Sequence, residues 1–316
     1  REVKTIVFDK TGTLTLGRPQ VTDVVVLEGD ERELLRLAGS AEQGSEHPVG
    51  KAVVESAKLR GVALSAPDEF ETVRGKGVAA RVGGRKVLVG NARLLQERGV
   101  EIAVAEADLV RLEGEAKTTM LVAVDGQLIG LLAVADPIKP ESAEAIGALH
   151  GLGIRTVMLT GDNQRVAEAI ARRAGIDHVV AGVLPDGKVA EIQRLQAEYG
   201  AVAMVGDGIN DAPALTQANV GVAIGTGTDI AIESADITLV RGDLWGVVSA
   251  IKLSHATFRK IRQNLFWAFF YNLIMIPLAV LGLLHPALAE IAMASSSITV
   301  VTNANLLRRA DIRGRR

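Results

Sequence analysis

The chain has 316 residues, with 35 Lys and Arg against 37 Asp and Glu and a formal net charge of −2. This length is typical of about two domains, and the nearly balanced charge argues against a nucleic-acid partner. Because the chain has no cysteine, disulfide bonds and thiolate metal sites within it are excluded.

Short apolar segments that end in polar loops recur along the chain and predict buried strands. We expect strands at residues 5–9, 156–160, 202–205, 220–224 and 237–240. Helical patterns lie between the later strands, at residues 141–151, 164–174, 185–199 and 212–218. Strands that alternate with helices predict an α/β fold with a doubly wound parallel sheet. In such sheets the functional loops lie at the carboxyl ends of the strands.

A different pattern occupies residues 22–135, between the first strand and the rest of the sheet. Its expected helices are 31–41 and 49–60, and its expected strands are 70–73, 78–82, 86–89, 118–124 and 127–134. Asp125-Gly126 separates the last two strands as a hairpin turn. We therefore expect an inserted α+β domain, with residues 1–21 and 136–250 forming the interrupted parallel domain. The crossings at 16–21 and 135–140 are the expected hinges.

Two long apolar segments, 263–284 and 287–307, follow an expected connecting helix at 251–262. Each is long enough to cross a bilayer, since a span needs roughly 20 mostly apolar residues. Lys and Arg flank both outer ends and are absent from the short connection, which predicts a hairpin with both ends and the preceding domains in the cytoplasm. Two buried core helices are the alternative. Glu290, the only charge of the second segment, lies either near the outer interface or on an exit path.

The segment FDKTGTLT places Asp9 at the end of the first strand. A carboxylate there can attack phosphorus and form an acyl phosphate, with Lys188 neutralising charge on the transferred group. Asp9 and Asp207 could hold Mg2+, which prefers oxygen ligands, and Thr160, Gly161 and backbone amides could hold the phosphoryl oxygens. A carboxylate that only caps the loop is the alternative for Asp9 taken alone.

Three motifs together, DKTGTLT from Asp9, TGDN from Thr160 and MVGDGINDAPAL from Met204, resemble the P-type ion-pumping ATPases. The phosphorylation domain of that family belongs to the haloacid-dehalogenase-like superfamily. The resemblance implies that Asp9 is the phosphorylated residue and that Lys188 contacts the phosphate. It also implies catalytic roles for Lys10, Thr11, Thr160, Gly161 and Asp162, and Mg2+ ligation by Asp207 and the Thr11 carbonyl, with Asn210 and Asp211 in support.

Phosphatases of that superfamily carry a second aspartate two residues after the nucleophile, as a general acid and base. Thr11 occupies this position, so we expect the phosphate on Asp9 not to hydrolyse quickly unaided. A pump needs this delay, because the phosphoenzyme must outlast a conformational change.

The inserted domain contains Glu42, the pair His47-Pro48 and the segment Gly75-Lys76-Gly77. A histidine before proline is usually a surface or helix-start residue, and a lone GxG is usually a hairpin turn. Together they resemble the nucleotide-binding domain of the heavy-metal branch of the family. The resemblance implies that His47 lies against adenine with Glu42 nearby. It also implies that Gly75 and Gly77 let the backbone approach ATP closely, since glycine has no Cβ. Gly90-Asn91 fits the same pattern.

Polar residues lie in the middle of both apolar segments: Tyr271 and Asn272 in the first, and Met293, Ser296 and Ser297 in the second. Polar residues at such a depth are costly and often functional. A thioether suits Cu(I) or Ag(I) better than Zn2+, and the pattern resembles the copper(I)-exporting members. Contacts between the helices are the alternative role for these residues.

We therefore expect the catalytic half of an ATP-driven copper(I) exporter, with ATP and Mg2+ as cofactors, in a prokaryotic plasma membrane. Because the chain starts with Arg1 and contains no actuator domain or preceding membrane helices, we expect a longer protein that supplies them. The expected partners are these upstream parts, the lipid bilayer and a soft metal ion. The alternatives are the same pump with Ag(I), Zn2+ or Cd2+, a membrane-tethered phosphatase, and a non-catalytic nucleotide sensor.

Overall fold

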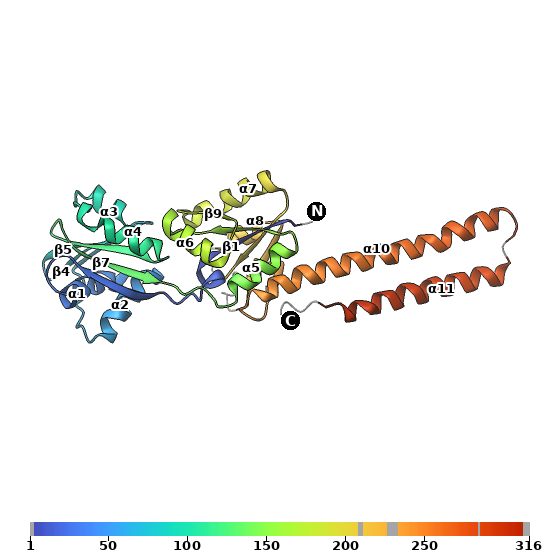
Figure 1. The fold of residues 1–316 in the computed structure, drawn as a ribbon, viewed down its shortest axis with the longest axis horizontal. Coiled ribbons are helices and arrows are strands. Elements are labelled where there is room, and N and C mark those ends of the chain that lie inside the picture. Colours follow the sequence, from blue (N-terminus) through green and yellow to red (C-terminus); the bar gives the residue numbers. More distant parts are fainter. Residues whose placement is uncertain (1–2, 208–210, 226–232, 284, 312–316) are drawn as a thin grey trace. The chain divides into compact units, whose positions relative to one another are not determined.

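The computed structural model describes residues 3–207, 211–225, 233–283 and 285–311. The chain divides into two units, Arg1–Leu244 and Trp245–Arg316. Two β-sheets with their helices make up the first unit, and two long helices dominate the second (Figure 1). The predicted fold class, a parallel sheet with an inserted α+β domain, is confirmed in the first unit.

A parallel sheet forms around β1, the first strand of the chain, with the order β12-β11-β10-β1-β8-β9. Its strands are β1 (Thr5–Asp9), β8 (Arg155–Leu159), β9 (His178–Val180), β10 (Val202–Gly206), β11 (Val220–Ile224) and β12 (Ile237–Leu239). Phe8 is in register with Met158 of β8 and with Val205 of β10. The carboxyl end of β1 therefore lies between those of β8 and β10.

Helices cover both faces of this sheet. They are α5 (Ser142–Gly151), α6 (Gln164–Ala174), α7 (Lys188–Tyr199) and α8 (Ala212–Gln217). Right-handed crossovers place α5 and α6 on one face and α7 and α8 on the other, because the strand order runs outward from β1 in two directions. Side chains of α7 and α8 pack against Val7 and Met204. The bounds of α6 match the prediction because Asn163 caps its start through Val166 N and Gly175, at φ 77°, ends it.

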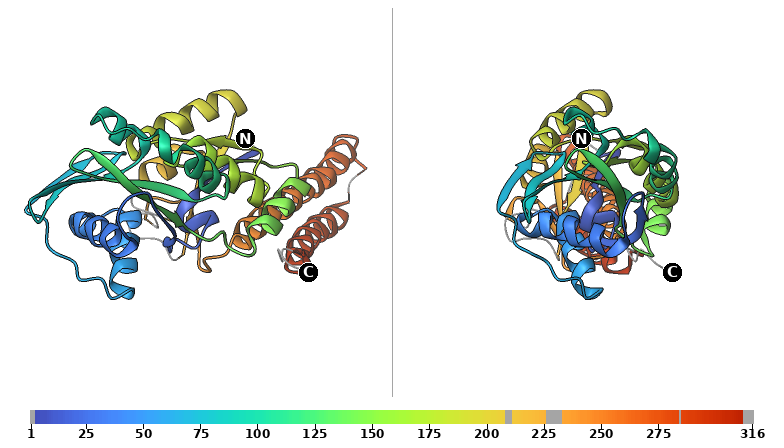
Figure 2. Two further views of the ribbon diagram at one scale, coloured as in Figure 1. Left: turned by 60° about the vertical axis from the view of Figure 1, so that its left-hand side comes forward. Right: turned by 90° about the vertical axis from the view of Figure 1, so that its left-hand side faces the viewer.

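The inserted domain is an antiparallel sheet of order β2-β7-β6-β5-β4-β3 with helices on both faces (Figure 2). Its strands are β2 (Gln20–Val26), β3 (Glu69–Val73), β4 (Gly77–Val82), β5 (Arg85–Gly90), β6 (Thr118–Val124) and β7 (Gln127–Ala135). The helices α1 (Glu31–Ala41) and α2 (Pro48–Leu59) pack on one face. The helices α3 (Ala92–Glu97) and α4 (Glu106–Gly114) pack on the other. The insertion therefore has hydrophobic cores of its own.

The two chain segments that enter and leave the inserted domain lie side by side. Thr15 Oγ1 donates a hydrogen bond to Asp136 Oδ2 at 2.6 Å, and Leu16 N donates to the Pro137 carbonyl at 2.9 Å. The strands that continue from them, β2 and β7, pair antiparallel. The two crossings predicted as hinges are thus bonded to each other.

The second unit consists of α10 (Trp245–Val280), α11 (Pro286–Asn305) and a short 3-10 turn, Leu306–Arg309. The predicted connecting helix at 251–262 and the predicted span at 263–284 form one helix of 36 residues that already begins at Trp245. Between residues 247 and 276 the sequence has neither glycine nor proline, so no helix-ending residue separates the polar half from the apolar half.

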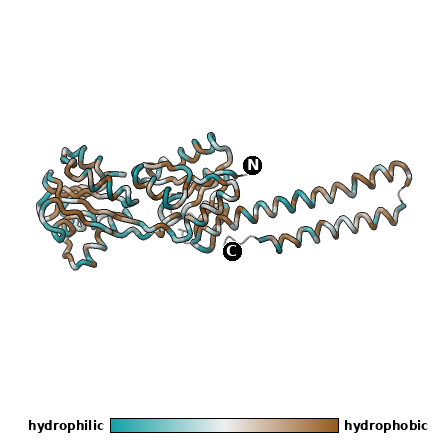
Figure 3. The backbone as a smooth tube through the Cα atoms, in the orientation of Figure 1, coloured by the Kyte–Doolittle hydropathy of each residue, from teal (hydrophilic) through white to brown (hydrophobic). Residues whose placement is uncertain are grey.

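Polar side chains join α10 to α11. Asn303 accepts a hydrogen bond from Lys260 Nζ at 2.8 Å and donates one to Asn264 Oδ1 at 2.7 Å. Farther along the pair, the hydroxyls of Tyr271 and Thr299 lie 3.4 Å apart. Hydrophobic residues recur along both helices (Figure 3). The two helices therefore form an antiparallel hairpin with a mostly apolar, exposed surface.

Among the helices of the described ranges, α10 is the one that is long and apolar enough to cross a membrane. The predicted second span, α11, is not among the helices with that length and apolarity. A hairpin with two spans therefore stays a prediction.

Candidate active site

Asp9 is the last residue of β1, and its side chain is buried. The chain then turns through Lys10–Leu14, where Gly12 has a φ of 73°. A Cβ atom added to Gly12 would lie 1.6 Å from Asp207 Oδ2. Since no side chain fits there, glycine lets the loop after Asp9 lie directly against the carboxylate that follows β10.

A buried lysine pairs with two carboxylates in this site. Lys188 begins α7, and its Nζ lies 2.6 Å from Asp9 Oδ1 and 2.6 Å from Asp211 Oδ1. All three side chains are buried, and buried charges need such compensation. The structure thus brings together Asp9 and Lys188 as predicted from their motifs. It also pairs Asp211 with the lysine. The sequence predicts Asp211 only as a supporting residue of the Mg2+ site, so this contact is a new finding.

Burial controls the titration of this cluster. It raises the pKa of Asp9, and the nearby charge of Asp211 raises it further, while Lys188 acts in the opposite direction. Burial also raises the pKa of Asp207 to about 6, again with a contribution from Asp211. For Lys188, burial lowers the pKa, but Asp9 and Asp211 outweigh this and hold it above its usual range. The carboxylates repel one another, and an additional cation would relieve that repulsion.

The same carboxylates fit a magnesium ion. One oxygen each of Asp9, Asp207 and Asp211 lies within 4.8 Å of the others, and Mg2+ prefers hard oxygen donors of this kind. Asn210, predicted to support the ion, lies outside the described residues. Thr11 has an extended backbone, with φ −74° and ψ 129°, and ligation by its carbonyl stays a prediction.

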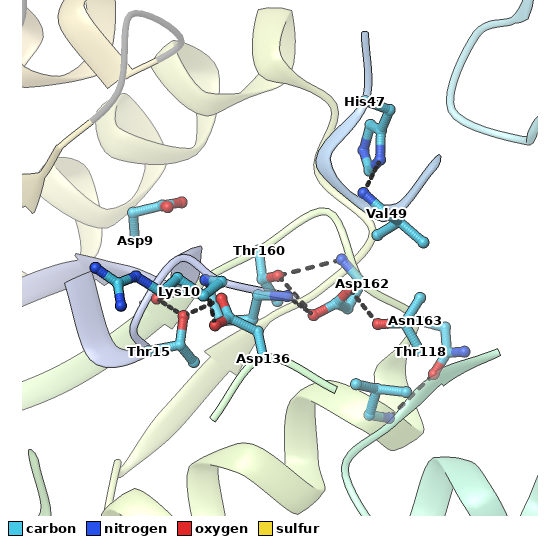
Figure 4. Close-up of polar contacts among 12 residues, drawn as sticks. Asp9, Lys10, Thr15, His47, Val49, Thr118, Asp136, Thr160, Asp162 and Asn163 are labelled. Carbon is cyan, nitrogen blue, oxygen red and sulfur yellow. Dashed lines mark hydrogen bonds and ion pairs between the residues drawn. The ribbon is translucent and has the colours of Figure 1, made fainter. Parts of the chain in front are cut away.

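The loop after β8 lies beside the loop after β1 (Figure 4). Lys10 Nζ is 2.7 Å from Asp162 Oδ2. Thr160 Oγ1 donates to Asp162 Oδ2 at 3.3 Å and accepts from Asp162 N at 3.2 Å, with Gly161 between them in the turn. The DKTGT and TGDN motifs, far apart in the sequence, are therefore joined by an ion pair.

The inserted domain also contacts this loop. Thr118 Oγ1 donates to Asp162 Oδ1 at 3.2 Å, and Asn163 Nδ2 donates to Glu113 Oε1 at 2.8 Å. Arg165 lies 3.2 Å from the second oxygen of Glu113. Sequence reasoning missed Glu113, because a single acid on a short helix carries no recognisable signal.

Two predicted nucleotide-binding residues, Glu42 and His47, lie in the segment just before α2. Glu42 is only 2% exposed, and burial raises the pKa of its carboxyl to about 7, against a hydrogen bond from Ser45. His47 caps α2, since its Nδ1 accepts a hydrogen bond from Val49 N at 3.2 Å (Figure 4). This contact leaves Nε2 as the ring nitrogen without a hydrogen-bond partner among the described residues. Contact of either residue with a nucleotide stays a prediction.

The other four predicted nucleotide-binding residues lie together at the start of β4 and the end of β5, where Gly77 pairs with Gly90. Asn91 Nδ2 donates to the Gly75 carbonyl at 3.1 Å. A Cβ atom on Gly77 would lie 2.2 Å from a carbonyl oxygen of β5, and one on Gly90 would lie 2.3 Å from the Lys76 carbonyl. Both positions need glycine because the backbones of β4 and β5 approach each other closely there. This requirement holds with or without a bound nucleotide.

The residues predicted for the transported ion lie on α10 and α11, and their role toward an ion stays a prediction. Asn272, Met293 and Ser297 are exposed, and Met293 is 72% exposed. Asn272 Nδ2 donates to the carbonyl of Ala268, one turn earlier in the same helix. In residues 245–283 and 285–311, no hydrogen bond or ring contact joins any two of Tyr271, Asn272, Met293, Ser296 and Ser297.

A further functional candidate is Lys139, which sequence reasoning did not single out. Its buried Nζ donates to the Gly12 carbonyl at 2.7 Å and to the Gly242 carbonyl at 2.8 Å. The sequence around it, ADPIKP, indicated only a hinge. A lysine between two prolines is the only local signal that the sequence offers, and it does not indicate burial.

Comparison with known proteins identifies relatives of the chain. A family model for haloacid dehalogenase-like hydrolases matches residues 3–219. A copper-exporting P-type ATPase of Staphylococcus saprophyticus is 51% identical over 311 residues, which cover 98% of this chain and 39% of the relative. A copper-exporting P-type ATPase of Bacillus subtilis is 52% identical over 301 residues, covering 95% and 38%. The chain thus spans about two fifths of the length of these relatives.

Solved structures give the same result for the fold. A zinc-transporting PIB-type ATPase in its E2.Pi state matches 96% of this chain and 50% of its own chain, with a TM-score of 0.69 and 38% identity. The catalytic domain of the CPx-ATPase CopB-B matches 79% of this chain with a TM-score of 0.61 and 31% identity. Because this match covers 89% of that catalytic domain, the chain belongs to the P-type ATPases, a family that shares the haloacid dehalogenase-like fold.

Proposed function

We propose that the chain is the catalytic part of an ATP-driven copper(I) exporter that works through a phosphorylated Asp9. The observation that carries this proposal is the ion pair between Asp9 and Lys188, buried at the carboxyl end of β1 beside Asp207. Relatives that are 51% and 52% identical are named as copper-exporting P-type ATPases.

In the proposed reaction, one oxygen of the Asp9 carboxylate attacks the γ-phosphorus of ATP. The bond between the γ-phosphorus and the bridging oxygen breaks, and ADP leaves with that electron pair. Lys188 favours the ionised form of Asp9 and balances negative charge on the transferred group. Mg2+, held by Asp9 and Asp207 with Asp211 nearby, would add positive charge against the phosphoryl oxygens. Lys10 and Asp162 hold the two loops in place through their ion pair.

Thr11 determines what happens next. Its side chain is not a carboxylate, so this loop offers no general base that would activate water against the acyl phosphate. The phosphate therefore persists until another part of the protein removes it. This property favours a pump over a membrane-tethered phosphatase.

The inserted domain is proposed to bind ATP. His47 is exposed, and its Nε2 has no hydrogen-bond partner among the described residues, so this edge of the ring is offered to the adenine. Glu42 and the Gly75–Gly77 turn are proposed as further parts of the nucleotide site. Thr118 and Glu113 contact the TGDN loop, so the same domain reaches the site of phosphoryl transfer.

The transported ion is proposed to be Cu(I), bound with the help of Met293, Tyr271 and Asn272. A thioether is a soft donor that suits this ion. Because Met293 is exposed, the site would be completed by helices of the longer protein. Ag(I), Zn2+ and Cd2+ are the alternatives, and one structural relative is a zinc-transporting ATPase. The pump would lie in a plasma membrane with its catalytic domains in the cytoplasm.

The test uses the full-length protein, incubated with labelled ATP and Mg2+ and with Cu(I), Ag(I), Zn2+ or Cd2+, each held in a fixed oxidation state. The readout is acid-stable phosphoprotein, with Asp9→Asn as the control. Label that appears only with Cu(I) or Ag(I), and not in Asp9→Asn, supports the proposal. Label with Zn2+ or Cd2+ instead keeps the pump and overturns the ion. An absence of label with every metal overturns the pump.

A further inference from the structure

Lys139 has a side chain that the proposed reaction does not use. It is 7% exposed, and its ammonium binds two backbone carbonyls, those of Gly12 and Gly242, without an ion pair to any described carboxylate. Burial lowers the pKa of this lysine, and four acids act on it through space in the opposite direction: Glu141, Asp207, Asp243 and Asp136. A buried charge that is held by carbonyl dipoles is costly, so its geometry is set by these two contacts.

The first contact is with the loop Lys10–Leu14, which follows Asp9. Gly12 presents its Cα to Asp207 and its carbonyl to Lys139 Nζ. The backbone of Lys139 is bonded to the same loop, since its N–H donates to the Leu14 carbonyl at 3.0 Å. Ser142 Oγ donates to that carbonyl as well, at 2.9 Å. The loop after Asp9 and the segment around Lys139 are therefore one bonded body.

The second contact is with the segment that leads out of the first unit. Gly242 follows β12, and only Asp243 and Leu244 separate it from Trp245, the first residue of α10. The bond from Lys139 Nζ to the Gly242 carbonyl is 2.8 Å long. One ammonium group thus binds both the loop that carries the phosphorylated residue and the segment that enters the long apolar helix.

We propose that Lys139 is a positioning residue that transmits movement of the loop after Asp9 to the start of α10. A change at Asp9 or Asp207 that shifts the Gly12 peptide also shifts Nζ, and with it the Gly242 carbonyl. Lysine suits this role because one nitrogen carries several donors, so a single atom serves both carbonyls. The use of this coupling in transport rests on the proposed function, whereas the coupling itself does not.

Trp245 provides the measurement. The chain has two tryptophans, so Trp267→Phe leaves Trp245 as the only one within it. Its Nε1 is buried without a hydrogen-bond partner among the described residues, which makes its emission sensitive to any change in burial. The full-length protein is prepared with no other tryptophan. Mg2+ with beryllium fluoride, a phosphoryl mimic that binds carboxylates without ATP or a transported ion, then loads Asp9.

In the protein with Lys139, loading is expected to shift the emission of Trp245. In Lys139→Met the loop should still load, with about tenfold more Mg2+ needed for half saturation, and the emission should no longer respond. Lys139→Arg retains a charge and several donors and should restore most of the response. Lys58→Met, at an exposed site, is the matched control and should behave like the unsubstituted protein.

Two results overturn the inference: a Trp245 response in Lys139→Met equal to that of the unsubstituted protein, or no response in the unsubstituted protein when loading is saturated. Lys139→Gln, which keeps amide donors, replaces the methionine variant if thermal melting shows that the latter is unfolded. Phosphoprotein formation from ATP is measured in parallel. Its absence would overturn the proposed function and leave the fluoride experiment as an independent test of the coupling.

Discussion

Lys188 Nζ and Asp9 Oδ1 lie 2.6 Å apart although 179 positions separate the two residues in the sequence. The same ammonium binds Asp211, so one positive charge serves two buried carboxylates. This contact makes the active site a determinant of stability as well as of chemistry.

Lys188→Met is expected to lower the free energy of unfolding by about 3–5 kcal/mol at pH 7, because it leaves buried carboxylates without their partner charge. Added Mg2+ should restore part of the loss by supplying another cation. Urea titration followed by circular dichroism in detergent, with and without Mg2+, measures both effects. Lys188→Arg keeps the charge and should lose less. A methionine variant as stable as the parent without Mg2+ would contradict the pairing.

Gly12→Ala is expected to reduce phosphoprotein formation about tenfold or more at low Mg2+, since its Cβ would displace the Asp207 carboxylate. Gly29→Ala is a matched control, because Gly29 has a φ of 81° but no atom within 4 Å of an added Cβ. Both variants carry similar backbone strain. Equal loss of phosphoprotein in the two variants would mean that strain, and not the clash with Asp207, is responsible.

Glu42 should make stability depend on pH. Its pKa is raised from 4.5 to about 7 by burial, so the folded state holds the proton more tightly than the unfolded state. The stabilisation from this group is complete below about pH 4.5 and declines by roughly 3 kcal/mol as pH rises to 7. Glu42→Gln removes this component.

The difference in unfolding free energy between the parent and Glu42→Gln, measured by urea titration at intervals from pH 4.5 to 8, isolates the contribution of Glu42. Glu46→Gln, at an exposed site nearby, should give a difference that does not vary in the same way. A flat difference for Glu42→Gln would show that its carboxyl is not perturbed.

The α10–α11 hairpin can be tested by cross-linking, because the chain has no native cysteine. Asn264→Cys with Asn303→Cys should react with a short bismaleimide, since these side chains are in contact. Asn272→Cys with Asn303→Cys should not, because position 272 lies about 12 Å farther along the helix. Gel mobility after proteolysis of the interhelical connection reports the product. Equal cross-linking of both pairs would contradict the hairpin register.

The positions of the active-site motifs could be predicted from the sequence, because each motif directly follows a recognisable strand. A short apolar strand followed by DKTGT, TGDN or GDGINDAP places carboxylates at one edge of a parallel sheet, and the ion pairs of Asp9 and Lys10 agree with that expectation. The number of strands was harder to predict. His178–Val180 is too short to show periodicity. The crossing predicted at 16–21 overlaps the start of Gln20–Val26, a strand that the sequence pattern does not predict.

The contacts of Lys139 and Glu113 could not have been predicted, because they depend on tertiary neighbours. Lys139 meets Gly12 and Gly242 from positions 127 and 103 residues away, and no local pattern encodes such distances. The continuous α10 was missed for a different reason. Composition changes sharply near residue 263, so the sequence pattern divides the segment there, although no residue at that point ends a helix.

The bonded crossings at Thr15–Asp136 and Leu16–Pro137 have a consequence for how such a chain could arise. An insertion whose two ends are already neighbours adds little loop-closure entropy to its host, and this one brings its own hydrophobic cores. The inserted domain can therefore be exchanged as a unit between hosts, while the sheet that bears Asp9 keeps its register.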